Sequence, residues 1–435
     1  MILVLGAGVA GLAAAETLRR AGREFLVLEK EDAPGGWCRS SLVGGYRFDM
    51  SGHFLHTADP VLRTELQALP GLGWSKVTRR ARVFLEGRLT PFPFQVNLHG
   101  HDAALVGRCL KDFAAERIRE ALSGSAPPAN LAEWFERRFG AAMCRAFFSP
   151  YNRKMWRRPL SSMTYEWTDW SVPVPTFDEV LAGARGEGRR DGGYNATFLY
   201  PRRGGIGALP AAMAVPLSGR VRTRAEALSI DLRHKTVTTS AGDTIPFSAL
   251  ISTIPLPELA RRSRGGAASI GEAGRRLSWI KVLALNVGVR HPGRFDGHWH
   301  YVPGGDFPFF RVGCLSNVSP RVAPKGCASY FAEKSFRAGS RLDVEKETGA
   351  MLDGLARLGA IGSRSVVEAV SPVVLDPGYV VFDRARQEAV PRLRSAFARR
   401  GVFTAGRYGA WDYFGMEKSI ADGRRAAKEA ASFRG

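Results

Sequence analysis

The first 29 residues constrain the fold more than any other stretch of the chain. Ile2 to Leu5 is a short apolar run typical of a buried parallel strand, and it leads into the glycine pattern Gly6-Ala7-Gly8-Val9-Ala10-Gly11. Leu12 to Arg20 has the spacing of an amphipathic helix, and a second apolar run, Phe25 to Leu28, ends at Glu29. Three glycines between a strand and a helix, with an acidic residue roughly 20 positions further on, predict a dinucleotide-binding βαβ unit.

Each part of this pattern has a physical task. Gly6 allows the tight turn, Gly8 lets a pyrophosphate approach the backbone, and Gly11 lets helix and strand pack closely. The N-terminus of the helix then faces the phosphates. Glu29 can accept hydrogen bonds from a ribose, and its charge would repel a 2′-phosphate.

The residues after Glu29 separate FAD from NAD. Pro34-Gly35-Gly36-Trp37-Cys38-Arg39-Ser40 places an arginine after a glycine pair, which suits a second approach to a pyrophosphate. The segment resembles the extension found in FAD enzymes of the amine-oxidase and sugar-mutase type. We therefore expect FAD as the cofactor.

Length and composition limit the class of protein that this sequence can be. A chain of 435 residues can bury a large core in two or three layers. Five cysteines are scattered without metal-ligand spacing, which predicts a reduced, cytoplasmic protein with no metal site. No apolar run is long enough for a membrane span, and the nucleotide strand begins at residue 2, so we expect no transmembrane segment and no signal peptide.

The net charge of +21 is high enough to suggest an anionic partner. However, the arginines are dispersed through expected helices, as at Arg19-Arg20 and between Arg394 and Arg400, and no basic motif is interleaved with aromatic residues. We expect no nucleic acid partner. The charge is interpreted as a solvated arginine-rich surface whose field can also attract a diphosphate.

The order of the expected elements predicts an α/β fold with a discontinuous Rossmann-like FAD-binding domain, an inserted helical subdomain and an antiparallel-sheet substrate domain. Helical patterns fill about 102–145, strand patterns dominate 279–390, and a final strand (401–405) and helix (416–432) return to the nucleotide domain. The segment Val221 to Ala227 resembles the strand that lies along the FAD adenine. The predicted boundaries are 1–70, 195–255 and 395–435 for the FAD domain, 76–100 and 279–394 for the substrate domain, and 102–180 for the helical subdomain.

Several sequence blocks resemble the UDP-galactopyranose mutase family, nearer to its eukaryotic-type branch. The blocks occur in the family's order and span nearly the whole chain. They are Phe92-Pro93-Phe94-Gln95, Pro150 to Trp156, Asn195 to Gly205, Trp299 to Pro303, Phe307 to Arg311, Pro377-Gly378-Tyr379 and Gly406 to Gly409.

The resemblance implies a flavoenzyme whose net reaction is not a redox change. Reduced flavin N5 attacks the anomeric carbon of a nucleotide-diphosphate sugar, UDP is expelled and later returns, and pyranose and furanose forms interconvert. The flavin must be reduced for this chemistry, which implies NAD(P)H or a separate reductase as the electron source.

The resemblance also implies roles for individual residues. His53 lies beside flavin N5 and Arg311 binds the diphosphate, and these are the expected catalytic residues. The other expected substrate-binding residues are Phe92, Phe94, Gln95, Asn152, Trp156, Asn195, Trp299, Tyr301, Tyr379 and Tyr413. The expected FAD-binding residues are Gly6, Gly8, Val9, Ala10, Gly11, Glu29, Lys30, Gly36, Trp37, Arg39, Gly52, His53, Ala227, Gly406, Arg407 and Met416.

Some of these assignments have a plainer alternative. Arg311 can instead be an interior arginine paired with a carboxylate, Phe94 can belong to the core, and each tyrosine alone can serve core packing. Three positions depart from the family pattern: Ser171 replaces an arginine, His56 replaces a sugar-facing aromatic residue, and Phe92 replaces a uracil-stacking tyrosine. The departures predict a changed sugar or a changed reaction.

Two other functional classes stay open. An FAD-dependent oxidoreductase of the amine-oxidase or protoporphyrinogen-oxidase type would share the fold and act on a small molecule or sugar derivative. A flavin-bound basic scaffold protein is the non-enzymatic alternative. The intact glycine pattern and the set of tyrosines favour an enzyme.

Overall fold

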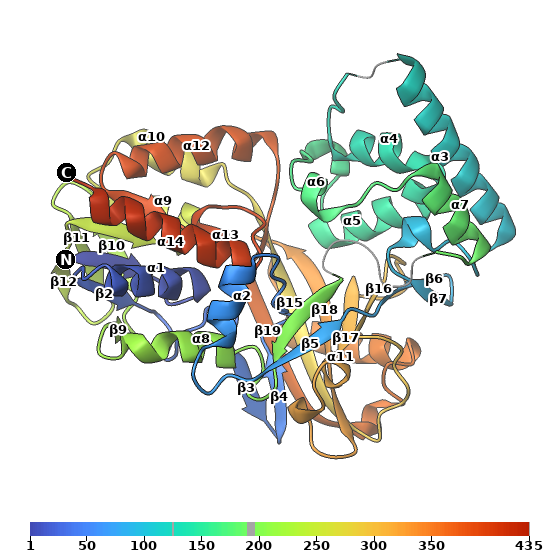
Figure 1. The fold of residues 1–435 in the computed structure, drawn as a ribbon, viewed down its shortest axis with the longest axis horizontal. Helices are drawn as coiled ribbons and strands as arrows, with labels where there is room; N and C mark the ends of the chain where they lie inside the picture. The colour runs from blue at the N-terminus through green and yellow to red at the C-terminus, as the bar shows by residue number, and fades with distance from the viewer. Residues whose placement is uncertain (124–125, 189–195, 435) are drawn as a thin grey trace.

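The computed structural model describes residues 1–123, 126–188 and 196–434. It contains a parallel sheet covered by helices, a larger and mainly antiparallel sheet, and a separate group of helices (Figure 1). The predicted α/β fold class is confirmed. The N- and C-terminal segments lie side by side on the parallel-sheet side of the molecule.

The parallel sheet draws its strands from the start, middle and end of the chain. Its order is β20 (Val402–Thr404), β13 (Ala249–Ser252), β1 (Ile2–Leu5), β2 (Phe25–Leu28) and β9 (Val221–Arg222), and all four pairings are parallel. Because helices or a second sheet cover both faces, the central strands β1 and β2 are apolar at every position rather than alternating. Ile2 and Val4 pack towards one side, and Leu3 and Leu5 towards the other.

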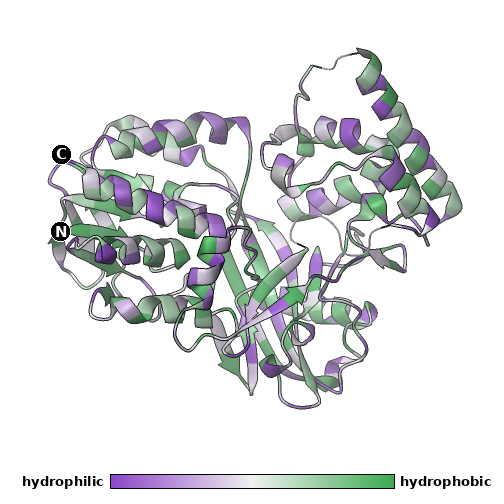
Figure 2. Ribbon diagram, in the orientation of Figure 1, coloured by the Kyte–Doolittle hydropathy of each residue, from purple (hydrophilic) through white to green (hydrophobic). Residues whose placement is uncertain are grey.

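Three helices cover the first face of this sheet, with their apolar sides turned inward (Figure 2). They are α1 (Val9–Arg20), α8 (Ala208–Ala214) and α14 (Met416–Ser432). A Cβ at Gly423 of α14 would lie 2.1 Å from the carbonyl oxygen of Ala10, so a glycine is needed for the two helices to cross this closely.

The second face is covered by three helices and by a four-stranded sheet. The helices are α9 (Leu256–Arg262), α10 (Ala268–Arg275) and α12 (Arg384–Ala398), and the strands are β10 (Ala227–Asp231), β11 (Thr236–Thr239), β12 (Thr244–Pro246) and β14 (Ser263–Arg264).

The larger sheet has seven strands and forms one wall of the functional site. Its order is β19 (Val367–Val380), β15 (Trp279–Arg290), β18 (Cys327–Arg337), β17 (Arg311–Cys314), β16 (Trp299–Tyr301), β6 (Ala81–Leu85) and β7 (Arg88–Pro91). One face packs on α11 (Val344–Arg357), where Leu283 and Leu285 meet Met351 and Leu355. Since side chains alternate along a strand, Val282 and Ala284 face the other way, into a core shared with the helices of residues 103–185.

Two short helices, α2 (Pro60–Gln67) and α13 (Gly406–Gly409), lie near the parallel sheet, and five further helices form a group of their own beside the seven-stranded sheet (Figure 1). They are α3 (Ala103–Ser123), α4 (Leu131–Met143), α5 (Ser149–Trp156), α6 (Thr168–Ser171) and α7 (Phe177–Arg185). They share a core rich in aromatic side chains, including Trp134, Phe139, Phe148 and Trp156.

One predicted strand is wrong. The segment 221–227 is not continuous: β9 ends at Arg222, Arg224 adopts a positive φ of 52°, and Ala227 begins β10 in a different sheet. The sequence also gave no signal for the pairing of β5 (Trp74–Thr78) with β8 (Thr197–Pro201), which are far apart in the chain.

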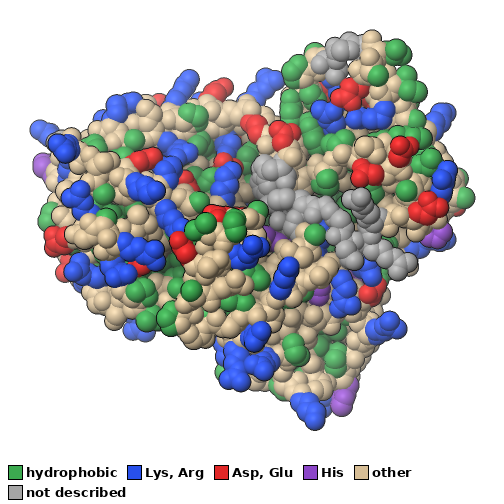
Figure 3. Space-filling model, in the orientation of Figure 1, with side chains coloured by type: hydrophobic (Ala, Val, Ile, Leu, Met, Phe, Trp, Pro, Cys, Tyr) green, Lys and Arg blue, Asp and Glu red, His purple; other side chains and the backbone are tan. Residues whose placement is uncertain are grey.

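Basic and acidic side chains are interspersed over the visible surface and do not form one continuous basic patch (Figure 3). Among the described residues, no helix is both long and apolar enough to cross a membrane.

Candidate functional site

A cavity of about 1340 Å³ lies where the carboxyl ends of β1 and β2 meet the seven-stranded sheet. This is the edge at which open α/β sheets bind their ligands, because the loops that follow the strands leave a crevice there. The cavity has two ends with different linings. One is built from the glycine-rich loops, and the other from aromatic and charged side chains of the seven-stranded sheet.

Glycines bring two loops together at the first end. Gly8 and Gly35 form a backbone bridge, and a Cβ at Gly36, whose φ is +56°, would lie 3.4 Å from the Cα of Gly8. A Cβ at Gly11 would lie 1.9 Å from the carbonyl oxygen of Gly6. Gly11 therefore packs beneath the turn rather than lining the cavity, as its predicted packing role requires.

Glu29 lies at the end of β2, buried to 5% exposure and on the cavity wall. Its two oxygens accept hydrogen bonds from the backbone N–H groups of Ala7 (2.7 Å) and Glu31 (3.0 Å). Each carboxylate oxygen keeps a second lone pair, which is available to a ribose hydroxyl. Arg39 lies nearby but is paired with Glu31 at 3.3 Å, so its first partner is the protein itself.

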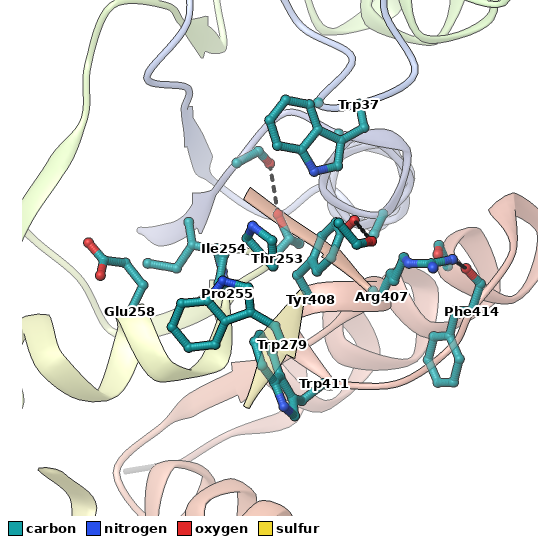
Figure 4. A pocket seen from close by; sticks show the side chains of 18 of the residues that line it. Trp37, Thr253, Ile254, Pro255, Glu258, Trp279, Arg407, Tyr408, Trp411 and Phe414 are labelled. Atoms are coloured by element: carbon teal, nitrogen blue, oxygen red, sulfur yellow. Dashed lines mark hydrogen bonds between the residues drawn. The ribbon is translucent and has the colours of Figure 1, made fainter. Parts of the chain in front are cut away.

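Arg407 lines the cavity and reaches towards Phe414 (Figure 4). Its Nη1 donates to the carbonyl oxygen of Phe414 at 3.0 Å, and its guanidinium lies 5.1 Å from the ring centre of Tyr379 and 4.6 Å from that of Tyr413. The Nε of Arg407 is buried and has no hydrogen-bond partner among the described residues. A buried N–H group without a partner is costly, so a ligand acceptor at this place would stabilise it.

His53 presents a similar unsatisfied atom. Its Nδ1 is buried, and no residue in the described part of the chain forms a hydrogen bond with it. Burial lowers the pKa of His53 to about 4, although Glu333 acts in the opposite direction. The imidazole is therefore neutral near pH 7 and can donate or accept one hydrogen bond at each ring nitrogen according to its tautomer.

Helix α14 closes the same region. It begins at Met416, its N-cap residue Gly415 provides no side-chain hydrogen bond, and both residues line the cavity. Free N–H groups at a helix N-terminus attract electron-rich ligand atoms.

These features fit FAD. The two glycine loops leave space for a pyrophosphate, Glu29 can bind a ribose, and His53, Arg407 and the first turn of α14 offer unsatisfied donors further along the cavity. The other predicted FAD-binding residues also line the cavity: Gly6, Gly8, Val9, Ala10, Lys30, Gly36, Trp37, Arg39, Gly52, Ala227 and Gly406.

At the second end of the cavity, Arg311 forms a bidentate ion pair with Glu333. Nε and Nη2 of Arg311 lie 2.5 and 2.7 Å from the two carboxylate oxygens, and Ser51 donates to the same carboxylate. Burial opposes the charge of Arg311, but Glu333 outweighs this effect and raises its pKa well above the usual value. The plainer alternative, an interior arginine paired with a carboxylate, is therefore what the structure contains, although Arg311 also lines the cavity.

Aromatic side chains form the walls around this ion pair. Tyr379 and Tyr413 stack with ring centres 5.6 Å apart, and Phe92 and Tyr301 lie 4.6 Å apart. Burial raises the pKa of both Tyr379 and Tyr413, so these phenols keep their protons and can donate hydrogen bonds. Trp299 lines the same space.

Four predicted substrate-binding residues do not line the cavity, because internal packing and hydrogen bonds occupy them. Phe94 stacks on Phe147 at 5.2 Å, and the Nε2 of Gln95 donates to the carbonyl oxygen of Pro173 at 2.9 Å. Asn152 and Trp156 bond to each other, through Nε1 of Trp156 and Oδ1 of Asn152 at 3.1 Å. Asn195 lies outside the described residues.

The departures from the family pattern do lie at the cavity. Ser171, His56 and Phe92 all line it. The hydroxyl of Ser171 donates back to the carbonyl oxygen of Trp167 at 2.6 Å, so it replaces the family's arginine with a group already bonded within its own helix.

Sequence reasoning missed Glu333, Ser51 and Arg79, all of which line the cavity. A partial signal for Glu333 existed, because this acidic residue directly follows the mainly apolar run Ala328 to Ala332. Only the sheet register places it directly opposite Arg311. Ser51 and Arg79 carried no such signal. Within the described ranges, no group of three or more His, Cys, Asp or Glu side chains is placed to hold a metal ion.

Comparison with known proteins gives the family. The model for flavin containing amine oxidoreductases matches residues 9–431. This chain belongs to that family. The family accounts for the glycine loops and implies the flavin that the cavity fits.

Solved structures of this flavin enzyme superfamily share the whole fold. Reduced UDP-galactopyranose mutase is similar with a TM-score of 0.92 and 27% identity, over 99% of this chain and 93% of that one. A putative protoporphyrinogen oxidase from Exiguobacterium sp. 255-15 has a TM-score of 0.73 at 18% identity, over 98% and 97% of the two chains, which shows the fold alone.

Curated relatives of this flavin-containing chain match over a short stretch. A putative flavin-containing monoamine oxidase of Mycobacterium tuberculosis is 48% identical over 62 residues, which is 14% of each protein. A phytoene dehydrogenase of Streptomyces griseus is 47% identical over 60 residues, 14% of this chain and 12% of that protein.

Proposed function

We propose that this flavoprotein is a mutase that interconverts the pyranose and furanose forms of a nucleotide-diphosphate sugar related to UDP-galactose. One observation carries the proposal: a chain-length match to reduced UDP-galactopyranose mutase, at 27% identity, coincides with a cavity in which Arg311, Tyr301, Tyr379 and Tyr413 converge beside His53. Fold alone would not carry a function, but the residues of the site support the same conclusion.

Residues at different places in the cavity have different roles in this proposal. The phenols of Tyr379 and Tyr413 donate to phosphate oxygens without adding charge, and Arg311 adds a cation whose direction is fixed by Glu333. Holding the diphosphate in place through its departure and return keeps it close to the sugar. When bound in its reduced form, FAD supplies the nucleophile for the anomeric carbon. The electrons would come from NAD(P)H or from a separate reductase.

The test is turnover by the reduced protein. The purified FAD-loaded protein is reduced anaerobically with dithionite and supplied with UDP-galactose and a panel of other nucleotide sugars. Product ring forms are measured by proton NMR, with oxidised protein as the control. Turnover in the reduced state alone supports the mutase, and absence of turnover with every donor contradicts it.

Binding provides a second readout. We expect UDP to bind in isothermal titration calorimetry and Arg311→Ala to weaken it by 10-fold or more, because a charge-assisted hydrogen bond to phosphate is lost. Undetectable UDP binding to the wild-type protein would count against a nucleotide substrate.

A second candidate is an oxidoreductase, as the family name suggests. The observation that favours it is the neutral Arg311–Glu333 pair, since a cation already matched by a carboxylate attracts a diphosphate less strongly than a free one. This candidate predicts flavin reduction by a substrate, followed by oxygen consumption and hydrogen peroxide formation.

A further inference from the structure

Among the described residues, two histidines line the cavity, His53 and His56. The proposed chemistry assigns a role to His53 but none to His56. It lies three residues after His53, on the same wall as Phe54 and Trp299. Its ring meets the ring of Phe198 edge-on at 5.6 Å, and Phe54 and Trp299 stack 5.1 Å apart next to Phe198. His56 is thus part of an aromatic corner but brings two nitrogens to it.

One hydrogen bond fixes which nitrogen carries the proton. The Nδ1 of His56 lies 3.2 Å from the carbonyl oxygen of Thr197. A carbonyl oxygen can only accept, so Nδ1 is the donor and bears hydrogen. In the neutral ring, Nε2 then carries a lone pair and no proton.

The surroundings keep the ring neutral. Burial lowers the pKa of His56 to about 4, and the nearby charge of Arg79 acts in the same direction. The hydrogen bond to Thr197 and the charge of Glu417 oppose them but do not outweigh them. Nε2 makes no hydrogen bond to any described residue and is not enclosed by protein. The ring therefore offers one permanent acceptor to whatever occupies the cavity at neutral pH.

We propose that His56 Nε2 accepts a hydrogen bond from one hydroxyl of the bound sugar and thereby sets which sugar is used. The inference rests on the proposed function for the nature of the ligand. It deepens that function, because it names a residue that would select among sugars. A flat apolar ring selects a sugar by shape alone. An imidazole acceptor also requires that the sugar carry a hydroxyl donor at a defined position. A ligand that lacks the donor leaves Nε2 desolvated without a partner, which penalises the wrong sugar.

Three substitutions separate the acceptor from the packing. His56→Asn retains a donor for the Thr197 carbonyl and removes the acceptor at the Nε2 position, while His56→Gln can place its Oε1 near that position. His56→Phe restores the aromatic residue of the family. The binding of UDP, UDP-galactose and the 2-, 3-, 4- and 6-deoxy forms of UDP-galactose is measured by calorimetry on the FAD-loaded proteins.

We expect UDP itself to bind equally to all four proteins, because it lacks the sugar. UDP-galactose should bind about 3- to 10-fold more weakly to the Asn and Phe variants, which is the range for one neutral hydrogen bond, and His56→Gln should recover most of the loss. One deoxy sugar should bind more weakly to the wild-type protein and show no further loss with His56→Asn.

The outcomes are distinguishable. Equal binding of every sugar by wild type and His56→Asn, with UDP binding intact, overturns the role of His56 and leaves the proposed function standing. Absence of UDP binding to the wild-type protein overturns the proposed function and this inference together. A loss of UDP binding in the variants shows that His56 supports the fold of the cavity, and overturns its role in sugar recognition.

Discussion

The ion pair between Arg311 and Glu333 makes a quantitative prediction. Glu333 is 1% exposed, the side chain of Arg311 is 17% exposed, and two hydrogen bonds of 2.5 and 2.7 Å join them. Replacing Glu333 by Gln removes the charge that matches the guanidinium and keeps nearly the same volume. We expect the folded protein to lose stability because Arg311 is then a cation in a poorly solvated site.

The size of the effect follows from the burial. Removing one partner of a buried ion pair costs about 3–5 kcal/mol. Because Arg311 borders the cavity and is partly hydrated, the lower end of that range, about 3 kcal/mol, applies. With an unfolding entropy of about 2.1 cal/mol/K per residue, a chain of this length should melt about 3 °C lower.

Thermal unfolding of FAD-loaded proteins, followed by circular dichroism, is the assay. The matched control is Glu388→Gln, which breaks an Arg276–Glu388 pair of similar length (2.6 Å) whose side chains are 46% and 51% exposed. Exposed pairs contribute about 0–1 kcal/mol, so this variant should melt within about 1 °C of wild type. Equal melting temperatures for Glu333→Gln and Glu388→Gln would refute the reasoning. The double variant Arg311→Met/Glu333→Gln should recover part of the loss, because no uncompensated charge remains.

Two further predictions concern the glycine-rich turn after β1 and the buried carboxyl group of Asp49 at the end of β4 (Tyr46–Asp49). Gly11→Ala should abolish flavin binding, because the new Cβ would lie 1.9 Å from the carbonyl oxygen of Gly6. The loss is measured as loss of visible absorbance in the purified protein. The control is Gly107→Ala, whose Cβ would meet nothing within 4 Å and which should retain the flavin. Burial raises the pKa of Asp49 to about 6, so folding favours the protonated form. The stability of wild type relative to Asp49→Asn should therefore fall by about 2 kcal/mol as pH rises from 4 to 6. Urea unfolding at pH 4, 5 and 6 measures this difference, and a difference that is constant or grows with pH would contradict it.

Much of the FAD half of the site could be predicted from the sequence, because its determinants are local. The turn at Gly6, the close packing at Gly11 and the acid at the end of β2 lie within one βαβ unit, where spacing along the chain fixes spacing in space. The closing helix was likewise predicted at its observed bounds, since Met416 to Ser432 has a clear helical period and follows a glycine.

The substrate-binding half of the site could be predicted only through the resemblance to the mutase family, and less completely than the FAD-binding half. Phe94, Gln95, Asn152 and Trp156 belong to sequence blocks typical of the family, yet their side chains are occupied by packing or by hydrogen bonds within the helical group. Whether a polar side chain faces a ligand or bonds its neighbours depends on contacts between segments, and no spacing along the chain encodes that choice.

By itself the sequence determined the fold class, the dinucleotide unit and the strands and helices that build it, because each of these depends on interactions between residues near in the chain. The tertiary structure alone decided that Arg311 shares its charge with Glu333, that Ser51 bonds the same carboxylate, and that Thr197 fixes the tautomer of His56. These partners are 22, 282 and 141 residues apart in the chain. Protonation and charge in the cavity therefore depend on which distant strands are brought side by side and how far they exclude water.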